Sequence, residues 1–289
     1  MTVTLPVALF AWMLMQVSAE SLMLQELIQR GEWRAALELG ESIYNSEAAD
    51  PHARYLIGVA RWQSDDKVGA IQAFRAAERL GLDASYLHLA LGLAYYEANQ
   101  FVLFKRQMRR AVAVAPSDAR PHIHLGRYFE SVARDFATAL THFEKALALD
   151  PANAESLYLR AYCLEELHRT DQALEAYARA AAEGSSLASL GMARILTASD
   201  PEDALQWATR AVRENADWAE SHYVRARILF ALKRRAEALH EAELALAADP
   251  DHPEAHFLLA RLLQLAGRRA AAGRILRRFE ELRAVYGDQ

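Results

Sequence analysis

The sequence predicts an all-α fold, a right-handed α-solenoid of about seven to eight helical hairpins, from three observations. Small side chains recur at a period of about 34 residues along nearly the whole chain. Within each period two small residues lie about twelve positions apart, which suits two helices whose backbones approach closely. Glycine and proline are otherwise scarce, with 12 and 8 among 289 residues, as expected for an all-helical protein.

The first element, residues 1–19, is predicted to be an export signal. It carries no charged side chain, has an apolar run over residues 5–15, and ends with the small residues Val17 and Ala19. A signal peptidase accepts such residues, which places the cut between Ala19 and Glu20 and the mature protein in the periplasm or an equivalent exported space. The lack of a Lys or Arg counts against a signal. The alternatives are a capping helix of a cytoplasmic protein and a misassigned start.

The remainder of the chain is predicted to hold the repeats. The expected units are residues 20–50, 51–84, 85–118, 119–153, 154–184, 185–218, 219–252 and 253–289. The recurrent position of each second helix is expected at Ala36, Ala70, Phe104, Ala139, Ala173, Ala204, Ala238 and Ala272, and it holds a small residue in every unit except the third. The small residue of each first helix is expected at Gly58, Gly92, Gly126, Ala161, Gly191, Ala226 and Ala260.

Several departures from a regular period are informative. Phe104 replaces a small residue and is expected to force the two helices of its unit apart. The step from Ala173 to Ala204 is only 31 residues, so the sixth unit is expected to be abbreviated. Arg160 and Arg225 fall at apolar positions, where an unpaired guanidinium would be costly, so each is expected to reach water or an acidic partner.

Proline and acidic residues separate the units. Asp50-Pro51, Asp150-Pro151 and Asp249-Pro250 lie between units, where proline ends one helix and admits the next. Asp200 and Pro201 are expected to open the second helix of the sixth unit. The last helix, from about residue 268 to 285, carries an apolar stripe surrounded by arginines, as expected of a terminal cap.

The unit resembles the tetratricopeptide repeat family, whose pattern reads W-x2-L-G-x2-Y, then A-x3-F-x2-A, then Pro. The fourth unit matches with Leu125, Gly126, Ala139, Phe143 and Pro151. Six or more copies in the same phase cover about residues 20–285. The resemblance implies stacked helical hairpins and a groove lined by the first helix of each unit.

Nothing in the composition or the motifs indicates catalysis, a cofactor or nucleic-acid binding. The net charge is -5, and no phosphate-binding, nucleophile-elbow or zinc motif is present. Four histidines recur at one repeat position, which favours a packing role over a metal or catalytic cluster; they are His88, His122, His222 and His256. The single cysteine, Cys163, is expected to be a buried small hydrophobe, with a reactive thiol as the alternative.

The resemblance places the partner-binding groove at the second, fifth, ninth and twelfth residues of each first helix. The candidate residues are Tyr55, Trp62, Tyr86, Tyr96, Arg120, Arg127, Tyr158, Tyr162, Tyr223, Arg227, Phe230 and Arg261. Tyr, Trp and Arg dominate binding hot spots. The alternative is that many of these aromatics are core. The Lys and Asn of the family's terminal-carboxylate clamp are absent from the corresponding positions.

The sequence therefore predicts a non-catalytic scaffold or adaptor that binds another protein or a peptide segment, with no stable membrane span after signal removal. Envelope assembly or secretion is the setting that an export signal implies by analogy. An accessory repeat subunit of a glycosyltransferase or protease complex is the alternative, and so is a structural brace that binds through its outer face.

Overall fold

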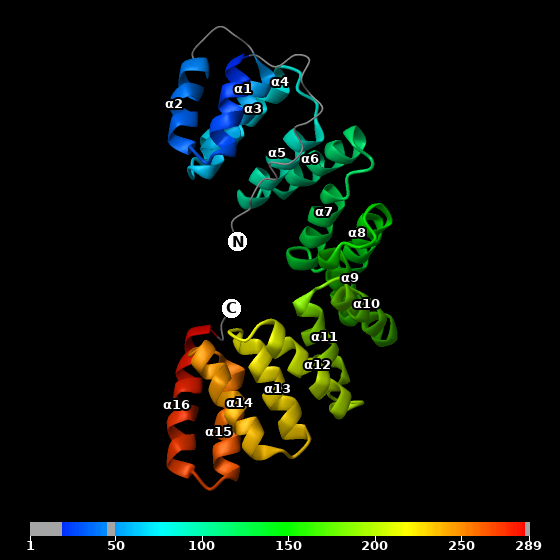
Figure 1. Cartoon of the computed structure of the whole chain (residues 1–289), viewed down its shortest axis with the longest axis vertical. Helices are drawn as coiled ribbons and strands as arrows, with labels where there is room; N and C mark the ends of the chain where they lie inside the picture. Colours follow the sequence, from blue (N-terminus) through cyan, green and yellow to red (C-terminus); the bar gives the residue numbers. More distant parts are fainter. Residues whose placement is uncertain (1–18, 45–49, 287–289) are drawn as a thin grey trace. The chain divides into compact units, whose positions relative to one another are not determined.

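The computed structural model describes residues 19–44 and 50–286. Within these ranges the chain forms sixteen α-helices and no β-strand (Figure 1). The predicted all-α solenoid of helical hairpins is thereby confirmed. The chain divides into two compact units, Met1–Leu125 and Gly126–Gln289, and each is described by itself.

The first unit holds three hairpins. Their helices are α1 (Ala19–Gln29), α2 (Trp33–Tyr44), α3 (Pro51–Gln63), α4 (Lys67–Arg79), α5 (Ser85–Glu97) and α6 (Phe101–Val114). Helix α7 (Arg120–Ser131) begins in this unit and ends in the second.

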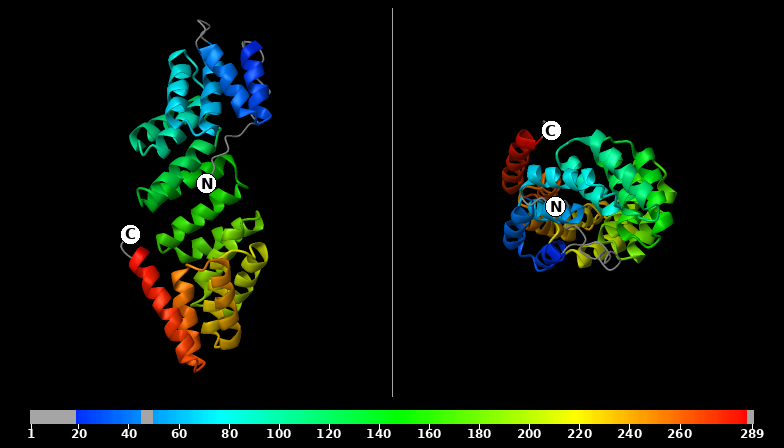
Figure 2. Two further views of the ribbon diagram at one scale, coloured as in Figure 1. Left: turned by 90° about the vertical axis from the view of Figure 1, so that its left-hand side faces the viewer. Right: turned by 90° about the horizontal axis from the view of Figure 1, so that it is seen from above.

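The second unit continues the same plan. Its helices are α8 (Phe136–Leu149), α9 (Ala154–Glu166), α10 (Thr170–Ala182), α11 (Ser186–Leu196), α12 (Pro201–Glu214), α13 (Ala219–Ala231), α14 (Arg235–Ala248), α15 (Pro253–Leu265) and α16 (Arg269–Tyr286). The last four lie side by side, in yellow, orange and red (Figure 2).

The small residues are buried where helices of the same hairpin or of neighbouring hairpins meet. Each alanine of the second-helix series is completely buried, and Phe104 is buried among them. Gly126 of α7 faces the buried ring of Phe143 in α8 so closely that an added Cβ would lie 2.6 Å from Cε1. This close approach explains why the period requires small side chains at these positions.

Most turns inside the hairpins contain one residue with positive φ. A residue with positive φ follows the first helix in seven hairpins, at Gly31, Asp65, Asn99, Arg134, His168, Lys233 and Gly267. Such residues close the helix C-terminus in the left-handed region. The turn between α11 and α12 lacks one, and α11 has only 11 residues. The sixth hairpin is therefore abbreviated, as its short period predicts.

The helix starts use the predicted caps. Asp50 accepts hydrogen bonds from the backbone N–H groups of His52 and Ala53 at the start of α3. Asp200 accepts one from Asp203 at the start of α12, and a proline follows each cap. An aspartate that satisfies free N–H groups and a proline that needs none together specify where a helix begins.

The arginines at apolar positions find acidic partners. The Arg160 Nε lies 3.8 Å from Glu144 Oε1, and the Arg225 Nη1 lies 3.1 Å from Glu241 Oε1.

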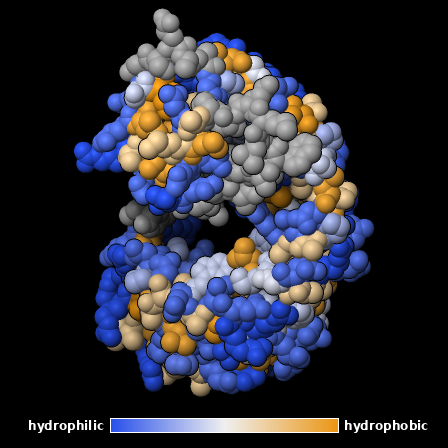
Figure 3. Space-filling model, turned by 45° about the horizontal axis from the view of Figure 1, so that its top comes forward, coloured by the Kyte–Doolittle hydropathy of each residue, from blue (hydrophilic) through white to orange (hydrophobic). Residues whose placement is uncertain are grey.

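The predicted export signal lies outside the described residues, except that Ala19 and Glu20 begin α1. None of the helices described is both long and apolar enough to cross a membrane. Hydrophilic residues predominate on the face in Figure 3, with apolar residues in small patches.

Candidate functional site

The candidate site is the surface formed by the first helices of successive hairpins, here called the first-helix face of each unit. In the first unit it comprises α1, α3 and α5 with the start of α7, and in the second unit the end of α7 with α9, α11, α13 and α15. The sequence predicted aromatic and arginine side chains along this surface. The structure decides which of them are exposed.

Tyr55 and Trp62 belong to the core of the first unit rather than to an open surface. Their exposed fractions are 7% and 6%. The Tyr55 ring packs 5.7 Å from that of Phe74 and 4.7 Å from that of Tyr86 in the next hairpin. The Lys67 ammonium lies 3.8 Å from the centre of the Trp62 ring. For these two residues the structure therefore favours the core interpretation over direct contact with a partner.

The other candidates of the first unit are half-buried. The Tyr86 hydroxyl lies 3.1 Å from His52 Nδ1, and burial raises the pKa of Tyr86 to about 12. Tyr96 packs edge-on against Phe104 with ring centres 5.3 Å apart. Both tyrosines keep part of their surface exposed. They can offer an apolar ring to a ligand without a change of fold.

Arg120 is also half-buried, but its charge is already neutralised. Its Nε and Nη2 donate to the two carboxylate oxygens of Asp118 at 2.9 and 2.8 Å. Burial alone would raise the pKa of Asp118, but hydrogen bonds from the Arg120 side chain and backbone hold that pKa below its usual value. Ser85 adds a hydrogen bond of 2.9 Å to the same carboxylate. Arg120 therefore has little unpaired charge to offer a partner.

In the second unit, Tyr158 and Tyr162 lie one turn apart on α9 and are half-buried. The Tyr162 ring packs edge-on against Phe136, with centres 6.1 Å apart. Burial raises the pKa of both tyrosines, so their hydroxyls stay protonated at neutral pH. Arg127 forms an ion pair with Glu155 at the start of α9. The arginine of this part of the face is thus neutralised as well.

A partly buried polar network links α9, α10 and α11. Glu165 accepts from Arg194 Nε at 3.0 Å and Nη2 at 2.6 Å, and from the Tyr177 hydroxyl at 2.8 Å. Burial raises the pKa of Tyr177 far above its usual value. The sequence prediction missed Arg194 because this residue stands three positions after Gly191, at a place in the repeat that was not assigned to the groove.

The last two first helices carry the remaining candidates. The Arg227 guanidinium carbon lies 5.9 Å from the centre of the Tyr223 ring, and that of Arg261 lies 4.8 Å from the Phe230 ring. Phe257 of α15 has an exposed fraction of 51%. Tyr223, Arg227 and Phe230 are half-buried, whereas Arg261 is exposed. This part of the second unit's face combines exposed aromatic surface with cationic groups.

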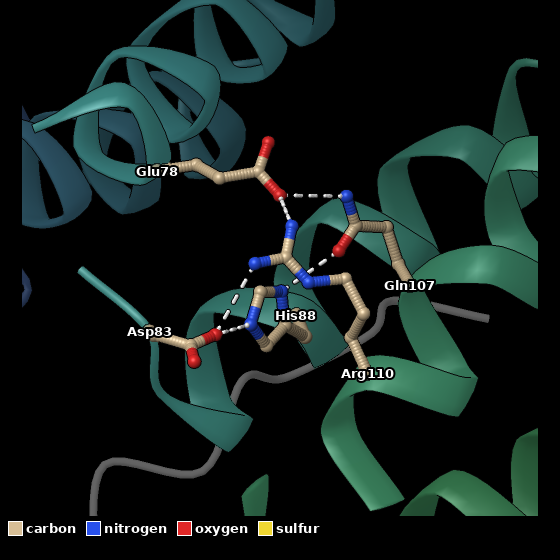
Figure 4. Close-up of polar contacts among 5 residues, drawn as sticks. All are labelled: Glu78, Asp83, His88, Gln107 and Arg110. Carbon is tan, nitrogen blue, oxygen red and sulfur yellow. Dashed lines mark hydrogen bonds and ion pairs between the residues drawn. The ribbon is translucent and has the colours of Figure 1, made fainter. Parts of the chain in front are cut away.

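The recurrent histidines whose contacts are described bond to neighbouring helices and turns. In α5, His88 is fully buried, with Nδ1 2.8 Å from Gln107 Oε1 of α6 and Nε2 2.7 Å from Asp83 Oδ1 (Figure 4). Arg110 Nη2 donates to the same Asp83 oxygen at 3.3 Å, and Glu78 accepts from both Gln107 and Arg110.

The seventh hairpin repeats this arrangement. His222 Nδ1 lies 2.7 Å from Glu241 Oε2 of α14, and its Nε2 donates to the Ala216 carbonyl at 2.9 Å. His256 likewise donates from Nε2 to the Pro250 carbonyl at 2.8 Å. Where their contacts are described, these histidines join helices and turns, as the packing interpretation predicts. Across residues 19–44 and 50–286, no group of three His, Cys, Asp or Glu side chains is placed to hold a metal ion.

Cys163 is completely buried in α9, and burial raises the pKa of its thiol to about 12. A thiol that stays protonated at neutral pH is a poor nucleophile. Cys163 therefore serves as a small apolar side chain of the core.

Comparisons with known proteins agree with the repeat. Family models of the tetratricopeptide repeat match residues 22–85, 142–175 and 219–252. No curated protein sequence matches the chain.

Solved structures share the fold. The C-terminal part of a TPR repeat-containing protein from Cytophaga hutchinsonii superposes with a TM-score of 0.68 at 15% identity, covering 83% of this chain and 99% of that one. A chain of the APC/C hetero-tetramer Cut9–Hcn1 gives a TM-score of 0.61 at 13% identity, covering 86% of this chain and 50% of that one. MamA from Desulfovibrio magneticus gives 0.51 at 15% identity, covering 58% of this chain and 96% of that one. At these identities the likeness concerns the fold alone.

Proposed function

Because this chain is a tetratricopeptide repeat protein, we propose that it is a scaffold that binds a protein or peptide segment along its first-helix face and catalyses no reaction itself. One observation carries the proposal: the half-buried Tyr158, Tyr162, Tyr223 and Phe230 all keep part of their surface exposed on the first helices of the second unit. Large rings with a polar edge bury much area and lose little side-chain entropy on binding. The Cut9–Hcn1 structure is a hetero-tetramer, which supports a protein-binding role for this fold.

The test begins with peptides selected on the immobilised full chain from a random-sequence display library. The affinity of a selected peptide is then measured for Tyr162→Ala and Tyr223→Ala. Each substitution is expected to cost about 1–3 kcal/mol of binding free energy if its ring anchors the peptide. The matched control is Val102→Ala, at a side chain of second helix α6 with an exposed fraction of 78%.

Two results would contradict the proposal. One is loss of binding in Val102→Ala with unchanged binding in both tyrosine variants. The other is a large loss of thermal stability in the tyrosine variants without a change in affinity. That second result would identify the tyrosines as core residues.

We also propose that the protein is exported and acts in envelope assembly or secretion. The uncharged apolar segment before Glu20 and the small residues at Val17 and Ala19 support export. The intact mass of protein recovered from its native host is expected to correspond to a chain beginning at Glu20. A soluble cytoplasmic form that retains residues 1–19 would contradict this part of the proposal.

A further inference from the structure

The arginines of the first-helix face differ in whether an acidic side chain of the same unit neutralises them. Arg120 is paired with Asp118, Arg127 with Glu155, and Arg194 with Glu165. For Arg227 and Arg261, by contrast, no carboxylate among the described residues lies within ion-pair distance of the guanidinium. Unpaired cationic charge on this face is therefore concentrated on α13 and α15.

The acids nearest in sequence are engaged elsewhere. Glu220 of α13 and Glu254 of α15 occupy the first turns of their helices. His252 lies between them, with Nε2 3.0 Å from Glu220 Oε2 and Nδ1 3.3 Å from Glu254 Oε2. The histidine thus holds both carboxylates at the N-terminal ends of the two helices, about two turns away from the arginines.

The two guanidinium groups lie near aromatic rings, and no described residue accepts a hydrogen bond from their N–H donors. Arg261 reaches from α15 to Phe230 of α13, and Arg227 lies over Tyr223 of its own helix. An aromatic ring attracts the cation, and neither guanidinium donates a hydrogen bond to another described residue. These N–H groups can therefore bind a carboxylate in the bidentate geometry that arginine favours.

An exposed apolar side chain completes the surface. Phe257 lies one turn before Arg261 on α15 and is half-exposed, with its ring 5.5 Å from that of Phe279 in α16. An aliphatic or aromatic side chain of a partner can cover this ring. The surface thus offers a hydrophobic contact beside two carboxylate-binding groups.

We propose that this surface, formed by Tyr223, Arg227, Phe230, Phe257 and Arg261, binds an acidic segment of a partner protein. The inference rests on the proposed function and specifies the chemistry of the partner. Packed helices lie about 8–10 Å apart, and an extended chain advances about 3.3–3.6 Å per residue. Two acidic residues two or three positions apart can therefore reach both arginines, with an apolar residue between or beside them on Phe257.

The test uses fluorescein-labelled nonapeptides in an anisotropy titration with the full chain. One peptide carries two glutamates three positions apart with leucines between them, and matched peptides carry glutamine or lysine in place of glutamate. The acidic peptide is expected to bind at least tenfold more tightly than the glutamine peptide, and its affinity is expected to fall as salt is added.

The double variant R227Q/R261Q is expected to lose at least tenfold in affinity for the acidic peptide. Its matched control is R274Q/R277Q, which removes the same charge from exposed positions of α16 in the last hairpin. The charge-reversed variant R227E/R261E is expected to bind the lysine peptide in place of the acidic one. Thermal unfolding of each variant checks that the fold is retained, and the gain of lysine-peptide binding cannot arise from misfolding.

Three results would overturn the inference. They are no binding of the acidic peptide, equal losses in R227Q/R261Q and R274Q/R277Q, and no gain of lysine-peptide binding in R227E/R261E. Each of these leaves the proposed function standing if library-selected peptides still depend on Tyr162 or Tyr223. Conversely, acidic peptides could require the two arginines while the binding of library-selected peptides is unchanged by Tyr162→Ala and Tyr223→Ala. That result would contradict the proposed function of the whole first-helix face and leave the acidic-segment site standing.

Discussion

Two glycine-to-alanine substitutions in the second unit are expected to change stability in opposite directions. Gly191 lies in α11 against Tyr177 of α10, and an added Cβ would be 2.6 Å from Cε1 and from Cζ of that ring. Gly273 lies inside α16, and an added Cβ there would meet nothing within 4 Å. The chemical change is identical, so the difference reports only the surroundings.

The structure sets the size of each effect. Non-bonded carbon atoms prefer about 3.5–4.0 Å, so the Tyr177 ring would have to retreat by roughly 1 Å. That ring is completely buried, and its hydroxyl donates to Glu165 at 2.8 Å. Overpacking costs typically about 1–3 kcal/mol, and alanine gains about 0.8–1 kcal/mol of helix propensity over glycine. Since strain on the hydrogen bond adds to the cost, Gly191→Ala is expected to lose about 1–2 kcal/mol, whereas Gly273→Ala gains about 0.5–1 kcal/mol.

Urea unfolding followed by far-ultraviolet circular dichroism gives the free energies. Tryptophan fluorescence adds a second probe, to which Trp207 contributes by packing against the same core cluster as Tyr177. The reasoning is refuted if Gly191→Ala is as stable as the wild type, or if both variants shift in the same direction by the same amount. Either result would mean that α10 and α11 are not in the close contact described.

Three further outcomes follow from the buried polar groups. Glu241→Ala leaves His222 and Arg225 without their shared carboxylate. It is expected to lower the unfolding free energy by about 3 kcal/mol, which is the lower end for a broken buried pair because Arg225 can reach water. In urea unfolding, the control variant Glu243→Ala at an exposed position is expected to change this free energy by less than about 0.5 kcal/mol. The hydrogen bond that His252 donates to the Glu220 carboxylate raises the pKa of His252 above 6.5. The stability that this pair contributes is therefore complete below pH 6.5 and is lost as the pH rises through the folded-state pKa. His252→Gln should therefore abolish a pH-dependent fall in the unfolding free energy, and a wild-type protein whose stability rises over that range would contradict the assignment. Cys163 is expected to resist iodoacetamide in the native protein and to react on unfolding, and mass spectrometry showing rapid native labelling would exclude the buried position.

The period predicts the hairpins well because it reflects local requirements. A small residue is needed where two adjacent helices meet, and Ala173 or Gly191 meets this need within its own or the neighbouring hairpin. Caps such as Asp50 and Asp200 act within three residues of themselves. Such features can be predicted from one sequence because cause and effect lie close together in the chain.

The exposure of the candidate site could not be predicted in the same way. Tyr55 is buried because Tyr86, in the next hairpin, covers its ring. Arg127 is neutralised by Glu155, 28 positions later, and Arg194 by Glu165, 29 positions earlier. Side-chain pairs between hairpins depend on how the helices are rotated against one another, which the period does not specify. The unpaired state of Arg227 and Arg261 therefore emerges only from the structure.

The most direct test of the account is photo-crosslinking with the acidic leucine peptide carrying a benzophenone side chain at its centre. After irradiation with the full chain, mass spectrometry of the digested product locates the attachment site. Crosslinks are expected on α13 and α15, near Phe257, and they should disappear in R227Q/R261Q but persist in R274Q/R277Q. Crosslinks confined to the second helices α14 and α16, and insensitive to Arg227 and Arg261, would contradict a binding role for the first-helix face of these hairpins.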